Sequence, residues 1–248
     1  MNEEKSGGSF GETVRTVVYA VLIALVLRTF AYEPFSIPSG SMLPTLKIGD
    51  YLFVSKFSYG YSHHSLPWGW PPFKGRVLSS DQPVERGDVA VFVLPSDGTT
   101  DYIKRIVGLP GDTVQVREGR LYLNGELVER ALLEPNLRTS ASGFAQTVTA
   151  YEEVLPNGVR HTIWERSDRE IYDNTPVFTV PDEHYFAMGD NRDNSQDSRT
   201  RQVGFIPKEN LIGRADMLFF SVDGSARFWE VWKWPTAVRW GRLFNGID

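Results

Sequence analysis

The sequence predicts a mainly β protein with an N-terminal transmembrane helix, followed by an all-β domain that carries a smaller inserted β subdomain. Three observations support this fold class. One long apolar segment lies near the N-terminus, and short runs of β-branched and aromatic residues follow it at roughly the spacing of successive strands. Turn pairs such as Gly-Asp and Asn-Gly separate those runs, a pattern typical of an all-β domain and not of alternating strands and helices.

The apolar segment covers residues 13–32 and is preceded by a short polar tail, residues 1–12. Twenty residues of helix would be about 30 Å long, which is the thickness of a bilayer core. A cleaved signal peptide is less consistent with the sequence, because no small-x-small site follows, and a buried core helix would show an amphipathic stripe. Lys5 and Arg15 on one side and Arg28 on the other give only a weak preference for a cytoplasmic N-terminus.

The β pattern divides the rest of the chain. Residues 33–116 and 181–222 are expected to form the main β core, residues 117–180 an inserted β subdomain, and residues 59–83 a long loop rich in Pro, Gly and Trp. The strands expected in the core and at the start of the insertion are 51–54, 89–93, 102–107, 113–116, 121–123, 186–188 and 217–222.

The C-terminal segment, residues 223–248, interleaves tryptophan with arginine and lysine. This composition suits a membrane–water interface. Tryptophan side chains that pack back onto the β domain are an equally good interpretation.

Composition excludes several kinds of chemistry. A net charge of −5 and a pI near 5.5 give no reason to expect a nucleic-acid partner. The absence of cysteine excludes disulfides, thiolate metal sites and a cysteine nucleophile, and four histidines limit histidine-based chemistry. The sequence also contains no zinc-protease H-E-x-x-H, no phosphate-binding loop and no G-x-S-x-G motif.

The segment 35–46, which follows the membrane helix, is the first candidate site. Pro38 and Pro44 exclude a helix interior, so the segment is expected to be extended with a tight turn at Gly40. Ser41, between this glycine and an apolar methionine, could present its hydroxyl at a surface beside free backbone N–H groups. The alternative is a simple loop that links the membrane segment to the folded domain.

Lys104 is the second candidate, because it lies inside an apolar strand. Alternation places it on one face with Tyr102 and Ile106, where burial would lower the pKa of the amine and make it a general base. A strand lysine can equally be an edge residue with a solvated tip. Lys56 is the second choice for the base, in what the neighbouring serines suggest is a wetter environment.

The third candidate is the polar loop 188–199, which is expected to be a rigid, self-satisfied hydrogen-bond network. A calcium loop is the rival interpretation. It fails the EF-hand test, because Ser198 occupies the required glycine position and Gly204 occupies the position of the bidentate glutamate.

Taken in order, these motifs carry a resemblance to a known family. They are Pro38-Ser39-Gly40-Ser41-Met42 with Pro44-Thr45-Leu46, Gly49-Asp50, Arg86-Gly87-Asp88-Val89, the run 101–112, and the run 189–199. With the preceding membrane segment, the ordered set resembles bacterial type I signal peptidase (leader peptidase, serine protease family S26). The resemblance covers most of the chain except roughly residues 60–80 and 117–180.

The resemblance implies a Ser/Lys dyad, with Ser41 as the nucleophile and Lys104 as the general base. The backbone N–H of Ser41 and the hydroxyl of Ser39 would form the oxyanion hole. Ser195 would hydrogen-bond Lys104 and hold its orientation.

The family pattern also implies supporting roles and a substrate pocket. Asp197 and Arg199 would pair and stiffen the loop that carries Ser195, while Ile37, Tyr102 and Ile103 would line the pocket. The family needs no metal and no organic cofactor.

The implied function is that of a membrane-bound serine endopeptidase, which removes N-terminal signal peptides from exported preproteins after small-x-small sites. By analogy it is a monomeric, single-pass protein of the bacterial cytoplasmic (inner) membrane, in contact with membrane lipid, with its catalytic domain on the extracytoplasmic (periplasmic) side. One alternative is a self-cleaving, repressor-like protease, which the membrane anchor and the lack of a DNA-binding half disfavour. The other is a membrane-tethered, non-catalytic β domain that binds exported chains.

Overall fold

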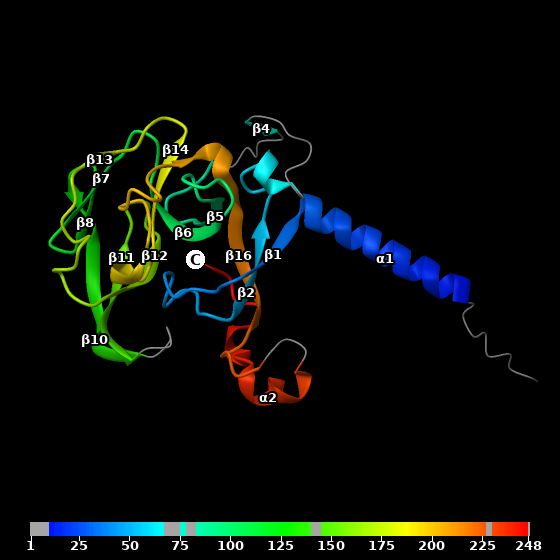
Figure 1. The fold of residues 1–248 in the computed structure, drawn as a ribbon. Helices are drawn as coiled ribbons and strands as arrows, with labels where there is room; N and C mark the ends of the chain where they lie inside the picture. The colour runs from blue at the N-terminus through cyan, green and yellow to red at the C-terminus, as the bar shows by residue number, and fades with distance from the viewer. Residues whose placement is uncertain (1–9, 67–74, 78–82, 140–144, 227–229, 248) are drawn as a thin grey trace, which may run out of the picture.

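A computed structural model describes residues 10–66, 75–77, 83–139, 145–226 and 230–247. Helix α1 (Phe10–Phe30) extends away from a β domain that contains nearly all the remaining elements (Figure 1). Among the described residues it is the one helix long and apolar enough to cross a membrane, judged by length and composition, and none of its apolar window is buried. The predicted N-terminal apolar helix is therefore present.

The bounds of this helix differ from the predicted 13–32. The first nine residues of the predicted polar tail lie outside the described residues, whereas Phe10 already belongs to α1. At the other end, Tyr32 opens strand β1 (Tyr32–Ser36) and pairs with Ser55. The pairing of β1 with β2 accounts for this early stop, because Tyr32 already has the extended backbone that the sheet requires.

A seven-stranded antiparallel sheet forms the main part of the β domain, in the order β1-β2-β16-β5-β6-β14-β15. Its other strands are β2 (Asp50–Ser55), β5 (Val89–Val93), β6 (Asp101–Gly108), β14 (His184–Met188), β15 (Ile206–Pro207) and β16 (Leu211–Ser221). The sheet is strongly curled (Figure 1), and residues of the early strand β1 and of the later strand β6 line the same cleft.

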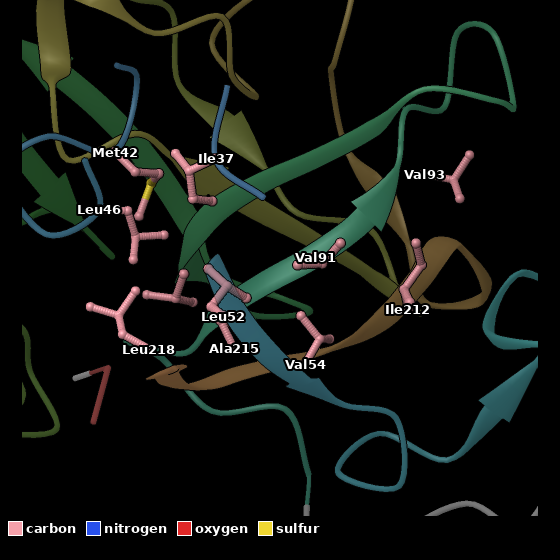
Figure 2. Packing of buried hydrophobic residues seen from close by; sticks show 11 residues of the cluster. Ile37, Met42, Leu46, Leu52, Val54, Val91, Val93, Ile212, Ala215 and Leu218 are labelled. Atoms are coloured by element: carbon pink, nitrogen blue, oxygen red, sulfur yellow. The ribbon is translucent and has the colours of Figure 1, made fainter. Parts of the chain in front are cut away.

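The core of this sheet also anchors the loop between β1 and β2. Met42 and Leu46 from that loop are completely buried, and they pack with Ile37, Leu52 and Val91 (Figure 2). Burying side chains of this size is worth about 1.5–3 kcal/mol each. The segment that the two prolines keep out of helix is therefore fixed to the sheet by its apolar residues.

Two smaller sheets cover the other side of the domain (Figure 1). One consists of β10 (Glu129–Thr139), β11 (Gln146–Val154) and β12 (Arg160–Glu165), and the other of β13 (Phe178–Thr179), β7 (Thr113–Arg117), β8 (Arg120–Leu123) and β9 (Glu126–Leu127). The Asn124-Gly125 turn between β8 and β9 has positive φ at both residues, as a type I′ hairpin requires.

Two segments differ from the predicted pattern. Strand β16 begins at Leu211 instead of 217, because residues 211–214 continue the pairing with β5 although Gly213 and Arg214 interrupt the apolar run. The predicted loop 59–83 contains, within its described part, the paired strands β3 (Tyr61–Ser62) and β4 (Arg76–Val77) and the 3-10 helix η1 (His63–Ser65).

The C-terminal segment folds into the short helices η5 (Val231–Lys233), α2 (Trp234–Ala237) and η6 (Trp240–Arg242). Trp234 packs against Phe220 of β16, with ring centroids 5.0 Å apart. Trp232 and Trp240 are 70% and 58% exposed and do not pack onto the domain as Trp234 does, and their place at a membrane–water interface stays a prediction. Residues 227–229, which include a further tryptophan, lie outside the described residues.

Candidate active site

Ser41 lies in a tight turn whose backbone is held from both sides. The Leu43 N–H donates to the Gly40 carbonyl (3.2 Å) and the Leu46 N–H to the Met42 carbonyl (2.8 Å). The Ser41 side chain is partly buried and faces a cleft, while its neighbour Met42 enters the core. The alternation of apolar and polar residues in this turn thus sends the methionine inward and leaves the serine hydroxyl accessible.

Lys104 extends from β6 toward this serine. Its Nζ lies 2.8 Å from the Ser41 Oγ and also donates to the Ile103 carbonyl at 2.8 Å. Only 4% of the residue is exposed, and burial lowers the pKa of the amine from 10.5 to about 8. The carboxylates of Asp197 and Asp190 act in the opposite direction but do not cancel the effect of burial.

The cleft beside this pair has a volume of about 630 Å³. Residues from β1 and the segment after it form one wall, and the first residues of β6 form the other. The three predicted pocket residues Ile37, Tyr102 and Ile103 all line it, with Phe35 and Val91 adding apolar surface. The ring of Tyr102 also lies under the Lys104 ammonium, 5.2 Å from Nζ to the ring centroid, so these two side chains share the face that alternation predicted.

The predicted oxyanion donors lie at the same end of the cleft. The Ser39 hydroxyl is exposed and 3.5 Å from the Ser41 Oγ, and both residues line the cleft. Within the described part of the chain, the Ser41 N–H has no hydrogen-bond acceptor. A backbone N–H without an acceptor at a cleft is available to a ligand oxygen.

The polar loop that follows β14, residues 188–199, packs against the Ser41 turn. Asp197 and Arg199 form a buried bidentate ion pair (2.9 and 2.8 Å), and Asp197 also accepts the Gly189 N–H at 3.0 Å. Burial acts to raise the pKa of Asp197, but Arg199 and these hydrogen bonds outweigh it and lower the pKa. The Asp197 carboxylate is therefore held in its charged form, and its ion pair with Arg199 fixes the loop.

Ser195 is buried in this loop but does not form the predicted hydrogen bond to Lys104. The Nζ of Lys104 bonds to Ser41 and the Ile103 carbonyl only, among the described residues. Ser195 instead packs against Gly189: a Cβ built on that glycine would lie 2.3 Å from the Ser195 Oγ and 2.5 Å from the Ser41 carbonyl oxygen. The close approach of these three segments fixes the position of Ser195, and a role in orienting Lys104 remains a prediction.

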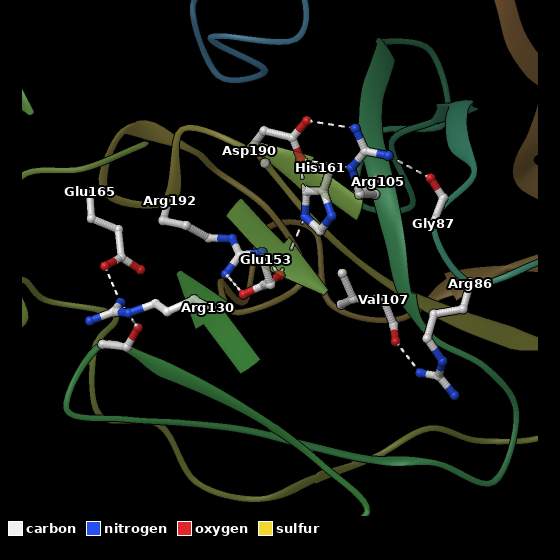
Figure 3. A network of polar contacts seen from close by, with 12 residues as sticks. Arg86, Gly87, Arg105, Val107, Arg130, Glu153, His161, Glu165, Asp190 and Arg192 are labelled. Carbon is white, nitrogen blue, oxygen red and sulfur yellow. Dashed lines mark hydrogen bonds and ion pairs between the residues drawn. The ribbon is translucent and has the colours of Figure 1, made fainter. Parts of the chain in front are cut away.

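A buried network of charged residues connects β6 with the smaller sheets (Figure 3). Arg105, next to Lys104 on β6, donates to both oxygens of Asp190 at 2.9 Å, and Asp190 accepts the Thr45 hydroxyl at 2.6 Å. His161 of β12 lies 3.9 Å from Asp190 and 3.3 Å from Glu153, which in turn pairs with Arg192. The network therefore includes charged residues that were not predicted to belong to the site.

Arg105 and Asp190 were not predicted from the sequence to belong to the site. One signal was available: Arg105 lies in an apolar strand and points to the face opposite Lys104, so a buried guanidinium there requires a carboxylate partner. The identity of that partner could not be read from the sequence.

Lys56 has a different environment from the wetter one predicted for it. It is 2% exposed, and its Nζ lies 2.9 Å from Glu33 of β1. This ion pair at the base of α1 compensates the charge, which leaves Lys104 as the lysine at the cleft.

A serine hydroxyl in hydrogen-bond contact with a buried lysine of lowered pKa, at the end of an apolar cleft, is the arrangement of a serine hydrolase that uses a lysine base. Residues 10–220 match the family model described as signal peptidase, peptidase S26. The chain therefore belongs to this peptidase family.

Two relatives agree in sequence with the family match. Signal peptidase I of Rickettsia typhi is 35% identical, over 98% of this chain and 96% of its own length. Signal peptidase I of Rickettsia akari is 37% identical, over 92% and 90%. A crystal structure of a signal peptidase I from Enterococcus faecalis is 31% identical and covers 54% of this chain and 98% of its own, with a TM-score of 0.31.

Proposed function

We propose that this chain removes signal peptides from exported preproteins, with Ser41 as the nucleophile and Lys104 as the general base. The observation that carries the proposal is the 2.8 Å contact between the Ser41 Oγ and a lysine amine whose pKa burial lowers to about 8. With that pKa, roughly one tenth of the lysine is neutral at pH 7, compared with less than one part in a thousand for an ordinary lysine.

In the first step the neutral Lys104 amine accepts the Ser41 hydroxyl proton as Oγ attacks the scissile carbonyl carbon. The carbonyl electron pair moves to oxygen, and the Ser41 N–H and Ser39 hydroxyl stabilise this oxyanion. Collapse expels the amine of the mature protein, which takes the proton from Lys104 and leaves an ester on Ser41. Water then attacks the ester, gives its proton to Lys104, and the released serine recovers that proton.

The cleft supports a preference for small-x-small sites. Its apolar walls, with Ile37 and Ile103 beside the reacting atoms, favour short apolar side chains over long or charged ones. Asp197 and Arg199, which brace the loop beneath, contribute through the position of that loop.

The finer localisation is also proposed. α1 would anchor the protein as a single-pass protein in the bacterial cytoplasmic membrane, with the β domain on the extracytoplasmic side, where exported chains emerge. The exposed Trp232 and Trp240 support contact between the C-terminal segment and lipid. A monomer without a nucleic-acid partner is expected. The alternative of a non-catalytic binding domain is not favoured by the family match.

The test is cleavage of a purified preprotein by the full-length chain in detergent, with the product N-terminus sequenced. We expect cleavage after a small-x-small site, reduced to background by Ser41→Ala and unaffected by Ser225→Ala, a serine outside the cleft. Wild-type rates in a folded Ser41→Ala variant would refute the assignment of the nucleophile.

A further inference from the structure

The peptide between Gly40 and Ser41 carries the N–H that would stabilise the oxyanion. This peptide is trans, so its carbonyl and its N–H lie in one plane and point in opposite directions. Whatever holds the Gly40 carbonyl therefore also sets the direction of the Ser41 N–H.

Asn191 holds that carbonyl. Its side-chain amide donates to the Gly40 carbonyl at 2.9 Å, and its backbone N–H donates to the Ser41 carbonyl at 3.1 Å. One residue thus fixes the carbonyl groups on both sides of the nucleophile. Asn191 is 1% exposed, so water cannot readily replace either bond.

The position needs such a brace, because glycine permits rotation of the adjoining peptide plane at little steric cost. Without the amide of Asn191, only the longer bond from the Leu43 N–H (3.2 Å) holds the Gly40 carbonyl among the described residues. Rotation of the plane would turn the carbonyl oxygen toward the cleft and the Ser41 N–H away from it.

Asn191 is itself fixed from the smaller sheets. The Trp164 N–H of β12 donates to the carbonyl of Asp190 at 2.8 Å, and Trp164 forms a parallel bridge to Asn191. Arg105 holds the Asp190 carboxylate from the other side. The asparagine therefore belongs to a rigid segment and not to a mobile loop tip.

We propose that Asn191 is a positioning residue for the oxyanion hole: its side-chain amide keeps the Gly40–Ser41 peptide oriented so that the Ser41 N–H faces the cleft. The inference rests on the proposed function, since it assumes that Ser41 is the nucleophile.

The test compares Asn191→Ala with wild type on a signal-peptide substrate and on a peptide aldehyde ending in Ala-x-Ala. Ser41 Oγ bonds to the aldehyde carbon and its proton passes to Lys104, so the former carbonyl oxygen occupies the oxyanion hole. We expect kcat to fall by about 100-fold with little change in KM, because the Ser41 N–H is displaced from the reacting atoms while the substrate still binds. Aldehyde affinity should weaken by a similar factor, because the aldehyde mimics the transition state.

Asn210→Ala is the matched control. Asn210 is also buried, and its side-chain amide also donates to a backbone carbonyl, that of Val93, at 2.9 Å. Its loss should lower stability by a similar amount and leave kcat and aldehyde affinity unchanged. If Asn191→Ala does not fold, Asn191→Asp keeps the size of the side chain and removes its donor, and the same two readouts apply.

A kcat within about threefold of wild type, with unchanged aldehyde affinity, would overturn the inference. So would equal losses in the Asn191 and Asn210 variants, because that result would indicate a general packing effect. The proposed function fails separately, if Ser41→Ala still cleaves. An inactive Ser41→Ala variant beside a normal Asn191→Ala variant refutes only the role of Asn191.

Discussion

Replacing Lys104 by methionine tests the origin of the lowered pKa. The folded protein holds the amine at a pKa of about 8 against the ordinary 10.5, a difference of roughly 2.5 units, and burial is the main cause. At about 1.4 kcal/mol per unit, the charged lysine costs the folded state about 3–4 kcal/mol. Methionine is similar in length and carries no charge, but it loses the two bonds to Ser41 and the Ile103 carbonyl, worth about 1 kcal/mol each. We expect Lys104→Met to be inactive and more stable, by about 1–2 kcal/mol near neutral pH.

The dependence on pH follows from the sign of the shift. Between pH 8 and 10.5 the unfolded chain keeps the lysine proton that the folded chain has lost, so wild-type stability gains with rising pH in this window. The advantage of Lys104→Met is therefore complete below pH 8 and shrinks above it. Wild-type cleavage should rise over the acid side of the same pKa, as the neutral base accumulates.

The assay is guanidinium unfolding of the full chain in detergent, followed by tryptophan fluorescence at about pH 7 and about pH 10. No tryptophan lies in α1, so the signal reports the remainder of the chain. A Lys104→Met variant that is less stable than wild type at the lower pH, or that differs by the same amount at both, would refute burial as the cause of the lowered pKa.

Two further predictions concern other parts of the chain. Gly189→Ala places a Cβ 2.5 Å from the Ser41 carbonyl oxygen, and the resulting displacement of Ser41 should lower kcat by about 100-fold. Gly241→Ala, with open space around its Cβ, should be neutral. Cleavage rates and unfolding curves of both variants test this. Removing Trp232 and Trp240 together should slow cleavage in lipid vesicles but not cleavage of a short peptide in detergent, and equal losses in both would argue against a lipid contact.

The local sequence pattern predicts the bounds of some strands and not of others. Strand 89–93 was predicted with its observed bounds, because both ends carry clear turn or breaker residues. Strand β16 was predicted too short, since its first residues are held by pairing with β5 and not by apolar alternation. For the candidate site, alternation placed Lys104 and Tyr102 on one face, whereas the neighbouring serines wrongly suggested a wetter environment for Lys56, which is buried against Glu33.

By itself the sequence determined the apolar N-terminal helix, the run of short strands and turns, and the absence of cysteine chemistry, because hydropathy, backbone sterics and composition are properties of the local chain. The resemblance in its motifs pointed to Ser41 and Lys104. Only the tertiary structure decided that these two residues, 63 positions apart, lie 2.8 Å from each other, and that Asn191 braces a peptide 151 positions away. The lowered pKa of Lys104 belongs to the same category, since it depends on how completely other segments exclude water from the amine.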